Sequence, residues 1–491
     1  MFVAAHEWTS AREPAARAAL PSNLAQAPQP DRTRQLYGRL AAGAVDQAAR
    51  ADADAFLRLA LSRAQAEDCD LPESPQDLAA WMHHSAQLAC AKYRAYLQER
   101  KAGAPRRYFQ NRAHALYFLR AVAPTKLVDG AWLSGLLAHW QNPRFADLIT
   151  TYAEELGEGR ADKNHVVLYR KLLAAHGLGQ AGDLPDDFYT QGALQLALGL
   201  NATDFLPEVI GFNLGYEQLP LHLLITAYEL NELGIDPYYF TLHITVDNAD
   251  NGHAQRAVQA VQDALPRLGG SAGFWRRVRN GSKLSNAGTG TTQVIAGFDL
   301  DCEVTAIFAR KSASGLGAHS DYCRVAGRSV NDWLAQPDHI PGFLAALQQA
   351  GWIKRGAPAQ ESRFWKLLQG EKAEMFGVFN PYELQLIHDW LRGDASADGQ
   401  AYDAPALLAG QRQATYRARA RLSQQQAGSL NVFDASQDEV LDPDLQTLQA
   451  ELAATGDRTQ KMQLLIQAMS PWNHWTPAGL YATRQFLRMG A

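Results

Sequence analysis

The segment from Tyr238 to Ala257 constrains this chain most, because it sets acids and imidazoles in a stretch flanked by apolar residues. Four polar side chains follow one another at spacings of four, three and three residues: His243, Asp247, Asp250 and His253. At about 100° per residue, one continuous helix would direct all four within an arc of roughly 120°. Burying two imidazoles and two carboxylates is costly unless something compensates them. A bound cation would do so, and non-heme iron best suits a mixed set that leaves open positions.

Length and charge limit the remaining possibilities. The chain has 491 residues, 47% of them apolar, which is enough for a large core and two or three domains. A formal net charge of −5 provides no field for holding nucleic acid or an anionic membrane. The four cysteines are scattered and form no C-x-x-C pair, so neither a disulfide framework nor a zinc ribbon is indicated. With no basic, apolar leader and no long apolar run, we expect a soluble cytoplasmic protein.

Helical periodicity dominates, and the sequence predicts an all-α fold. Two short β-like runs, at 293–298 and 302–309, are compatible with strand or helix. Five sections are expected: a mobile leader at 1–33, an N-terminal helical section at 34–104, a metal-binding bundle at 105–274, a second mostly helical section at 275–392, and a linker with C-terminal helices at 393–491. Gly211 and Gly215, four residues apart, should let another helix approach closely.

Further candidate ligands lie on other expected helices of the bundle. Asp129 stands among apolar neighbours and needs a partner, whether as a cap, an ion pair with Lys126 or a ligand. Glu155 and His165 are ten residues apart, and Glu154 and Glu158 compete with Glu155 for the same role. Glu217 lies just before Pro220, which should kink the helix. Glu208 is the acid that competes with Glu217 as a candidate ligand.

Carboxylates and histidines that project inward from a helical bundle are how di-iron carboxylate centres are built. The Glu-x-x-His pairs of ferritin-type centres are missing at the expected places. The order and spacing instead resemble the heme-oxygenase-like di-iron oxidases and oxygenases, also called iron-containing redox enzymes. In that family an acid is followed by Glu with a His about ten residues later, then another Glu, then His-x-x-x-Asp-x-x-His. The residues that match, over roughly 105–270, are Asp129, Glu155, His165, Glu217, His243 and Asp247.

This sequence departs from the family pattern at the last ligand. The position three residues after Asp247 is Asp250, and the imidazole comes later, at His253. Either Asp250 replaces the usual imidazole, or a helix irregularity such as a π-bulge, eased by Gly252, brings His253 into place. We favour His253.

The resemblance implies a heme-oxygenase-like bundle that binds two Fe(II) per chain and uses dioxygen as co-substrate. Its expected reaction is N-oxygenation of a small biosynthetic amine or amino acid, with oxidative desaturation or C–C fragmentation as the alternative. It also implies a small-molecule substrate, a possible external electron donor and a possible homodimer. Partners that would fix the histidine tautomers are sought among nearby polar side chains: Tyr152, Tyr169, Tyr216 and Asn248.

Other readings of the same residues stay open. The bundle could serve a metal-free enzyme resembling the pyrroloquinoline quinone synthases, in which His and Tyr move protons on an organic substrate. It could also be a helical scaffold whose His/Asp face is satisfied by water. Heme is disfavoured, because so many polar ligands would crowd a porphyrin pocket.

Overall fold

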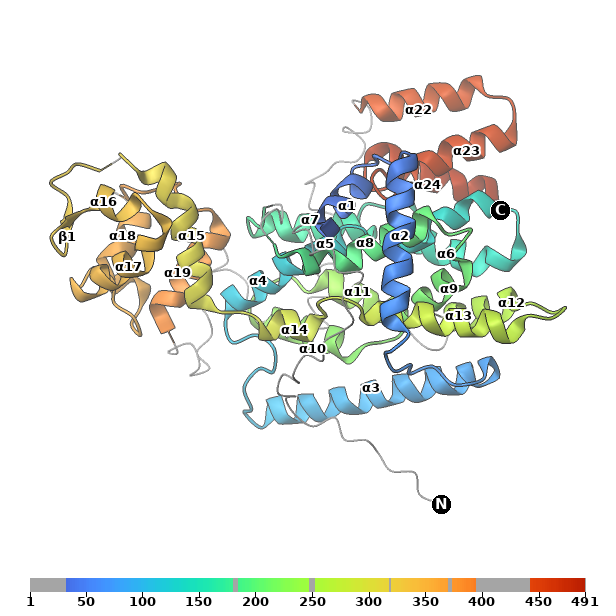
Figure 1. Ribbon diagram of the computed structural model, residues 1–491, viewed down its shortest axis with the longest axis horizontal. Helices are drawn as coiled ribbons and strands as arrows, with labels where there is room; N and C mark the ends of the chain where they lie inside the picture. The colour runs from blue at the N-terminus through green and yellow to red at the C-terminus, as the bar shows by residue number, and fades with distance from the viewer. Residues whose placement is uncertain are drawn as a thin grey trace, which may run out of the picture.

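A computed structural model describes residues 32–179, 184–246, 252–317, 319–369, 373–393 and 442–490. Helices make up nearly all of its regular structure, which confirms the all-α class (Figure 1). The short hairpin of β1 (Arg324–Val325) and β2 (Arg328–Ser329) is the sheet structure found within these ranges. Among the described residues, no helix combines the length and apolar character that crossing a membrane requires.

The helices before the bundle are long and amphipathic. Asp46 caps α2 by accepting a hydrogen bond from the backbone of Ala49, and Pro75 opens the turn that leads into α3. This section comprises α1 (Arg32–Ala41), α2 (Gln47–Ala64) and α3 (Leu78–Lys101).

The bundle itself is made of short helices that prolines and glycines interrupt. Pro124 divides its first apolar stretch, as its missing N–H and fixed φ predict. Its helices are α4 (Arg112–Ala121), α5 (Ala123–Lys126), α6 (Ala146–Glu155), α7 (His165–Ala175), α8 (Thr190–Leu200), α9 (Leu206–Tyr216), α10 (Leu221–Glu232), α11 (Tyr238–Val246), α12 (His253–Ala264) and α13 (Ser271–Lys283).

The two last sections lie on different sides of the bundle (Figure 1). One begins with α14 (Thr291–Ala296), which contacts α4 of the bundle, and continues into a separate lobe around the hairpin, drawn in yellow and orange. The helices of this lobe are α15 (Leu300–Gly315), α16 (Val330–Leu334), α17 (Ile340–Gln349), α18 (Arg363–Leu368) and α19 (Pro381–Arg392). The other packs against the bundle near α6 and is drawn in red: α22 (Pro443–Ala454), α23 (Arg458–Ala468) and α24 (Pro477–Gly490). The 293–298 and 302–309 runs are helical, in α14 and α15.

Two hydrophobic cores hold these sections together. One joins α2 and the C-terminal helices to the bundle, with Leu57, Trp132 and Met462 all buried in it. The second joins the other side of the bundle to the lobe and includes Phe240 and Leu386. Sections that are distant in sequence therefore share apolar cores with the bundle, and burial of that surface is what stabilises their arrangement.

The closest helix contact in the bundle occurs where glycine was expected to allow it. A Cβ added to Gly211 of α9 would lie 1.9 Å from the carbonyl oxygen of Val278 in α13. Across the same contact, a Cβ on Gly281 would lie 2.2 Å from the carbonyl oxygen of Glu208. Backbone therefore packs directly on backbone between α9 and α13, which confirms the sequence prediction.

One sequence prediction about helices is wrong. The segment from Tyr238 to Ala257 is not one helix, because α12 begins afresh at His253 after Gly252, whose backbone is extended at φ −92° and ψ −166°. The helix irregularity that was expected before His253 is present as a break at Gly252. Asp247 and Asp250 lie between α11 and α12, outside the described residues.

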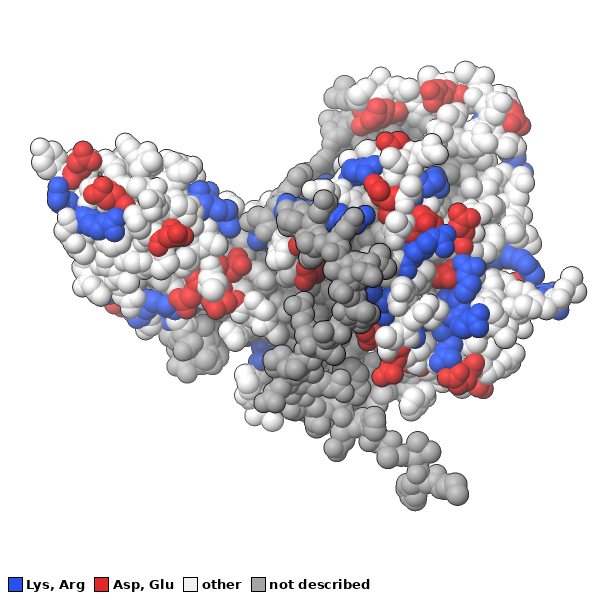
Figure 2. Space-filling model, in the orientation of Figure 1, with Lys and Arg blue, Asp and Glu red and all other residues white. Residues whose placement is uncertain are grey.

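Figure 2 shows the distribution of charge on one face of the molecule. Lysine and arginine side chains are interspersed with aspartate and glutamate over the described surface in this view. The ion pairs of the described residues include Arg58 with Asp54 at 2.8 Å and Arg279 with Glu73 at 2.6 Å.

Candidate metal centre

Six acids and imidazoles predicted from the sequence converge inside the bundle. Most lie at helix ends, where the chain changes direction and a polar side chain can turn inward. Asp129 follows α5, Glu155 ends α6, Glu217 follows α9, and His243 lies within α11. His165 and His253 are the first residues of α7 and α12, and all six side chains are buried.

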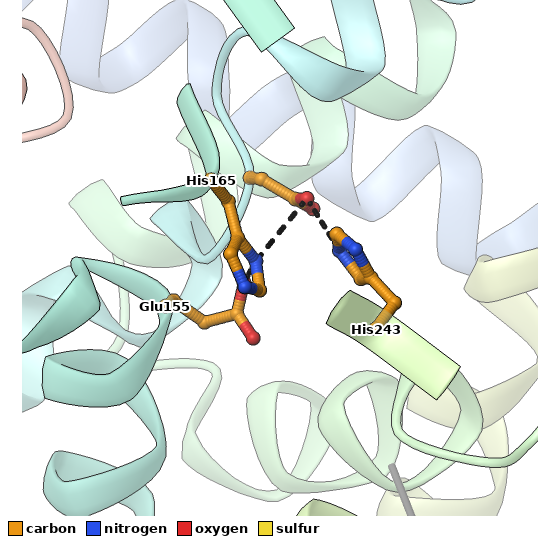
Figure 3. A group of neighbouring side chains, drawn as sticks. Glu155, His165 and His243 are labelled. Carbon is orange, nitrogen blue, oxygen red and sulfur yellow. Dashed lines mark hydrogen bonds and ion pairs between the residues drawn. The ribbon is translucent and has the colours of Figure 1, made fainter. Parts of the chain in front are cut away.

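One group of potential ligands consists of Asp129, Glu155, His165 and His243, whose ligand atoms all lie within 4.8 Å of one another. His165 Nδ1 lies 2.5 Å from Glu155 Oε2 and 3.8 Å from Asp129 Oδ2. His243 Nε2 lies 3.1 Å from the same Asp129 oxygen. In Figure 3, the side chains of Glu155, His165 and His243 reach the same point from separate elements.

A second group shares Glu155 with the first and adds Glu217 and His253. His253 Nδ1 lies 3.0 Å from Glu217 Oε2 and 3.4 Å from Glu155 Oε1. The two oxygens of Glu155 therefore face different groups, since Oε2 is the atom closest to His165. A carboxylate placed in this way can bridge two metal ions.

Neighbouring charges shift the pKa values of the acids and imidazoles in the first group. Burial raises the pKa of Asp129, but Lys126 and the imidazoles of His243 and His165 outweigh it and hold that pKa below its ordinary value. Burial likewise opposes ionisation of Glu155 and His165, yet their mutual attraction lowers the pKa of the acid and raises that of the imidazole. Burial and the charge of His165 lower the pKa of His243. Ionised carboxylates and a neutral imidazole are the forms that bind metal.

Two buried polar atoms of this cluster lack hydrogen-bond partners among the residues that the structure describes. They are Nδ1 of His165, whose close contact with Glu155 lacks hydrogen-bond geometry, and Oε1 of Glu217. Leaving such groups unsatisfied normally costs about 1–3 kcal/mol each. Carboxylate and imidazole donors, together with these orphaned atoms, fit a bound transition metal.

Tyr239, which the sequence analysis did not single out, holds two members of the first group. Its hydroxyl donates a hydrogen bond to Asp129 Oδ2 at 2.5 Å, and its backbone oxygen lies 2.8 Å from His243 Nδ1. The Lys126 ammonium lies 5.7 Å from the centre of the same ring. The signal that could have identified Tyr239 is its position four residues before His243, one helical turn away.

The sequence predicted Glu154 only as an alternative to Glu155 in the role of a ligand, but the structure places it outside both ligand groups, beside His253. Its carboxylate lies 2.8 Å from Nε2 of His253 and also forms an ion pair with Arg256. Glu158, the other competitor, is exposed and pairs with Lys163.

Three of the four expected partners of the histidines were predicted incorrectly. Tyr152 donates its hydroxyl hydrogen bond to Met469 O, Tyr169 to Leu119 O, and Tyr216 to Gln191 Oε1. Asn248 lies outside the described residues, as do the ligand candidates Asp247 and Asp250.

The C-terminal section supports the segment between Glu155 and His165. The hydroxyl of Tyr152 donates to Met469 O at 2.7 Å, one turn before Glu155. Asn164 caps α7 and also donates from its Nδ2 to His474 Nδ1 at 3.2 Å. His474 is 1% exposed, and nothing in its local sequence pointed to this contact.

Residues 116–282 match the family model described as iron-containing redox enzyme. This part of the chain belongs to the iron-containing redox enzyme family. The match confirms the resemblance recognised from the sequence. It also contains every described residue of the two ligand groups. No curated protein and no solved structure matches the chain.

The match over residues 116–282 supports a general iron oxidoreductase, and the buried carboxylate and histidine cluster fits iron binding. The C-terminal helices that hold Tyr152 and Asn164 lie beyond the matched residues. The roles of the individual residues as ligands remain predictions.

Proposed function

We propose that this chain is a non-heme di-iron enzyme that uses dioxygen to N-oxygenate a small amine or amino acid. The observation that carries the proposal is that Glu155 belongs to both groups of potential ligands. A carboxylate shared in this way is the feature expected of two adjacent ions held by a helical bundle.

The proposed ligands divide between the two ions. Asp129, His165 and His243 would bind the first, Glu217 and His253 would bind the second, and Glu155 would bridge them. Three carboxylates against the four positive charges of two ferrous ions leave a charge of about +1 when the imidazoles are neutral. The second group has fewer described ligands than the first, so it offers more positions for dioxygen or substrate.

Two ferrous ions, when bound, would supply electrons for the activation of dioxygen. The chain contributes a buried cluster from which bulk water is excluded, and carboxylates that stay ionised because of their neighbours. Tyr239 holds Asp129 and His243 in place. Repeated turnover would need an external electron donor to return the iron to the ferrous state.

The choice of N-oxygenation over desaturation or C–C fragmentation rests on the family resemblance. A primary or secondary amine offers a nitrogen lone pair, which can accept an oxygen atom from an activated iron site. Amino acids and small biosynthetic amines are therefore the substrate class that we propose to test first.

The first test counts iron. Chelator-treated protein would be loaded with Fe(II) under anaerobic conditions, freed of excess metal and analysed for iron by mass spectrometry. We expect about two irons per wild-type chain, about one each in His243→Ala and His253→Ala, and less than one in Glu155→Ala. Glu208→Gln is the control, because that acid pairs with Arg277 at 2.6 Å and belongs to neither group. Equal losses in all three ligand variants would contradict the assignment.

The second test concerns the reaction. Ferrous protein would be mixed with oxygenated buffer and panels of amines, amino acids and fatty acids, with oxygen consumption followed by electrode and products by mass spectrometry. N-oxygenation predicts a product that gains one oxygen atom from ¹⁸O₂. Loss of two hydrogens, or release of a one-carbon fragment, would favour the alternative reactions.

A further inference from the structure

We infer that Glu154 is a positioning residue that makes His253 bind metal through Nδ1, whereas His243 binds through Nε2. The inference rests on the proposed metal centre and adds to it the ring atom that each histidine uses.

The ring of His243 is oriented by its own helix. Its Nδ1 lies 2.8 Å from the backbone oxygen of Tyr239, one turn earlier in α11. A carbonyl oxygen can only accept, so Nδ1 carries the hydrogen and Nε2 is left with its lone pair. Nε2 faces the first group, where it lies 3.1 Å from Asp129 Oδ2.

The ring of His253 has the opposite orientation. Its Nε2 lies 2.8 Å from Glu154 Oε2, so this nitrogen donates to the carboxylate. Its Nδ1 faces the second group, 3.0 Å from Glu217 Oε2 and 3.4 Å from Glu155 Oε1. Nδ1 is therefore the ring nitrogen that an ion shared with Glu217 and Glu155 would meet, and Nε2 would keep its hydrogen for Glu154.

Glu154 is suited to this role by its place in the fold. It follows Ala153 in α6 and precedes Glu155, and adjacent helical residues point about 100° apart. Glu155 can therefore face the cluster while Glu154, 29% exposed, faces the start of α12. Arg256, three residues after His253, forms an ion pair with Glu154 and keeps its carboxylate beside the ring.

A carboxylate that accepts from the outer nitrogen of a ligating histidine fixes its tautomer and raises its basicity. Removing such a partner typically costs about 10- to 100-fold in metal affinity. Here the loss should fall on the second ion, because Glu154 contacts His253 and is absent from both groups of ligand atoms.

The experiment compares Glu154→Leu, which removes the acceptor, with Glu154→Gln, which keeps an acceptor oxygen on a side chain of similar shape. Glu158→Leu is the matched control, since this nearby glutamate is exposed and pairs with Lys163. Fe(II) would be titrated anaerobically into each chelator-treated variant. We expect Glu154→Leu to bind the first iron normally and the second about 10- to 100-fold more weakly. Glu154→Gln should restore most of that affinity, and the control should match the wild type.

The ring atoms can be read directly with zinc in place of iron. In zinc-loaded protein carrying ¹⁵N-labelled histidine, NMR should show His253 metal-bound at Nδ1 and protonated at Nε2, with the reverse for His243. Zinc or iron bound at Nε2 of His253 would overturn the inference and leave the di-iron proposal intact. Unchanged binding of the second iron in Glu154→Leu would do the same. A wild-type protein that binds neither metal would overturn both.

Discussion

The buried contact between His474 and Asn164 predicts that the wild type is more stable than a His474 variant at pH 7.5 but less stable than it at pH 5. In the folded chain, burial and the charge of Arg170 lower the pKa of His474 from 6.5 to about 3. Because the folded pKa is depressed, protonation favours the unfolded chain as pH falls below 6.5. Between pH 7.5 and pH 5, linkage with these two values costs the metal-free protein about 2 kcal/mol of unfolding free energy.

The substitution His474→Gln removes the titrating group. At pH 7.5 this variant should be less stable than the wild type by about 0.5–1.5 kcal/mol, because its bond with Asn164 is altered. At pH 5 the wild type has lost about 2 kcal/mol that the variant keeps, so the variant should be the more stable of the two.

Urea unfolding in the presence of a chelator, followed by tryptophan fluorescence at several pH values, measures the difference. His84→Gln, an exposed position on α3, is the control for a change from histidine to glutamine. If the unfolding free energies of wild type and His474→Gln changed in parallel between pH 5 and pH 7.5, the reasoning would be refuted. His474 would then have the same pKa in the folded and the unfolded chain.

Two further substitutions test the packing and the hydrogen bonding of the bundle. Gly211→Ala should destabilise the protein by about 1–3 kcal/mol or more, because its Cβ would lie 1.9 Å from Val278 O. Gly38→Ala is the control: a Cβ there meets nothing within 4 Å, so this variant should be neutral or stabilising in the same urea assay. Tyr239→Phe should destabilise the metal-free protein by about 1.5–3 kcal/mol, since it removes the 2.5 Å hydrogen bond to the ionised Asp129. Unchanged unfolding midpoints would show that these contacts do not contribute to stability.

Much of the site could be predicted because its acids and histidines can be recognised directly in the sequence. Acids and imidazoles inside apolar helices need compensation, and this requirement identified Asp129 and His243 before any geometry was known. The close approach at Gly211 was likewise predictable, since a missing side chain is visible in the sequence. Charge and spacing do not reveal which elements lie beside one another in space.

The errors came from contacts made by tertiary structure. Helical periodicity continued through the 238–257 segment, but Gly252 adopts an extended conformation and a new helix begins at His253. That break is what allows His253 to face Glu217 while its other nitrogen faces Glu154. The link between Asn164 and His474 joins residues 310 positions apart, and no local pattern could have predicted it.

The dependence of the metal centre on the C-terminal section has a consequence for biosynthesis. A ribosome that has completed α6 and α7 has made Glu155 and His165, but not Met469 or His474, which brace them. The nascent bundle would thus hold its ligands loosely until Met469 and His474 have been made and have packed against it. Iron loading would then follow the synthesis of these contacts, and chains truncated before Met469 would remain metal-poor.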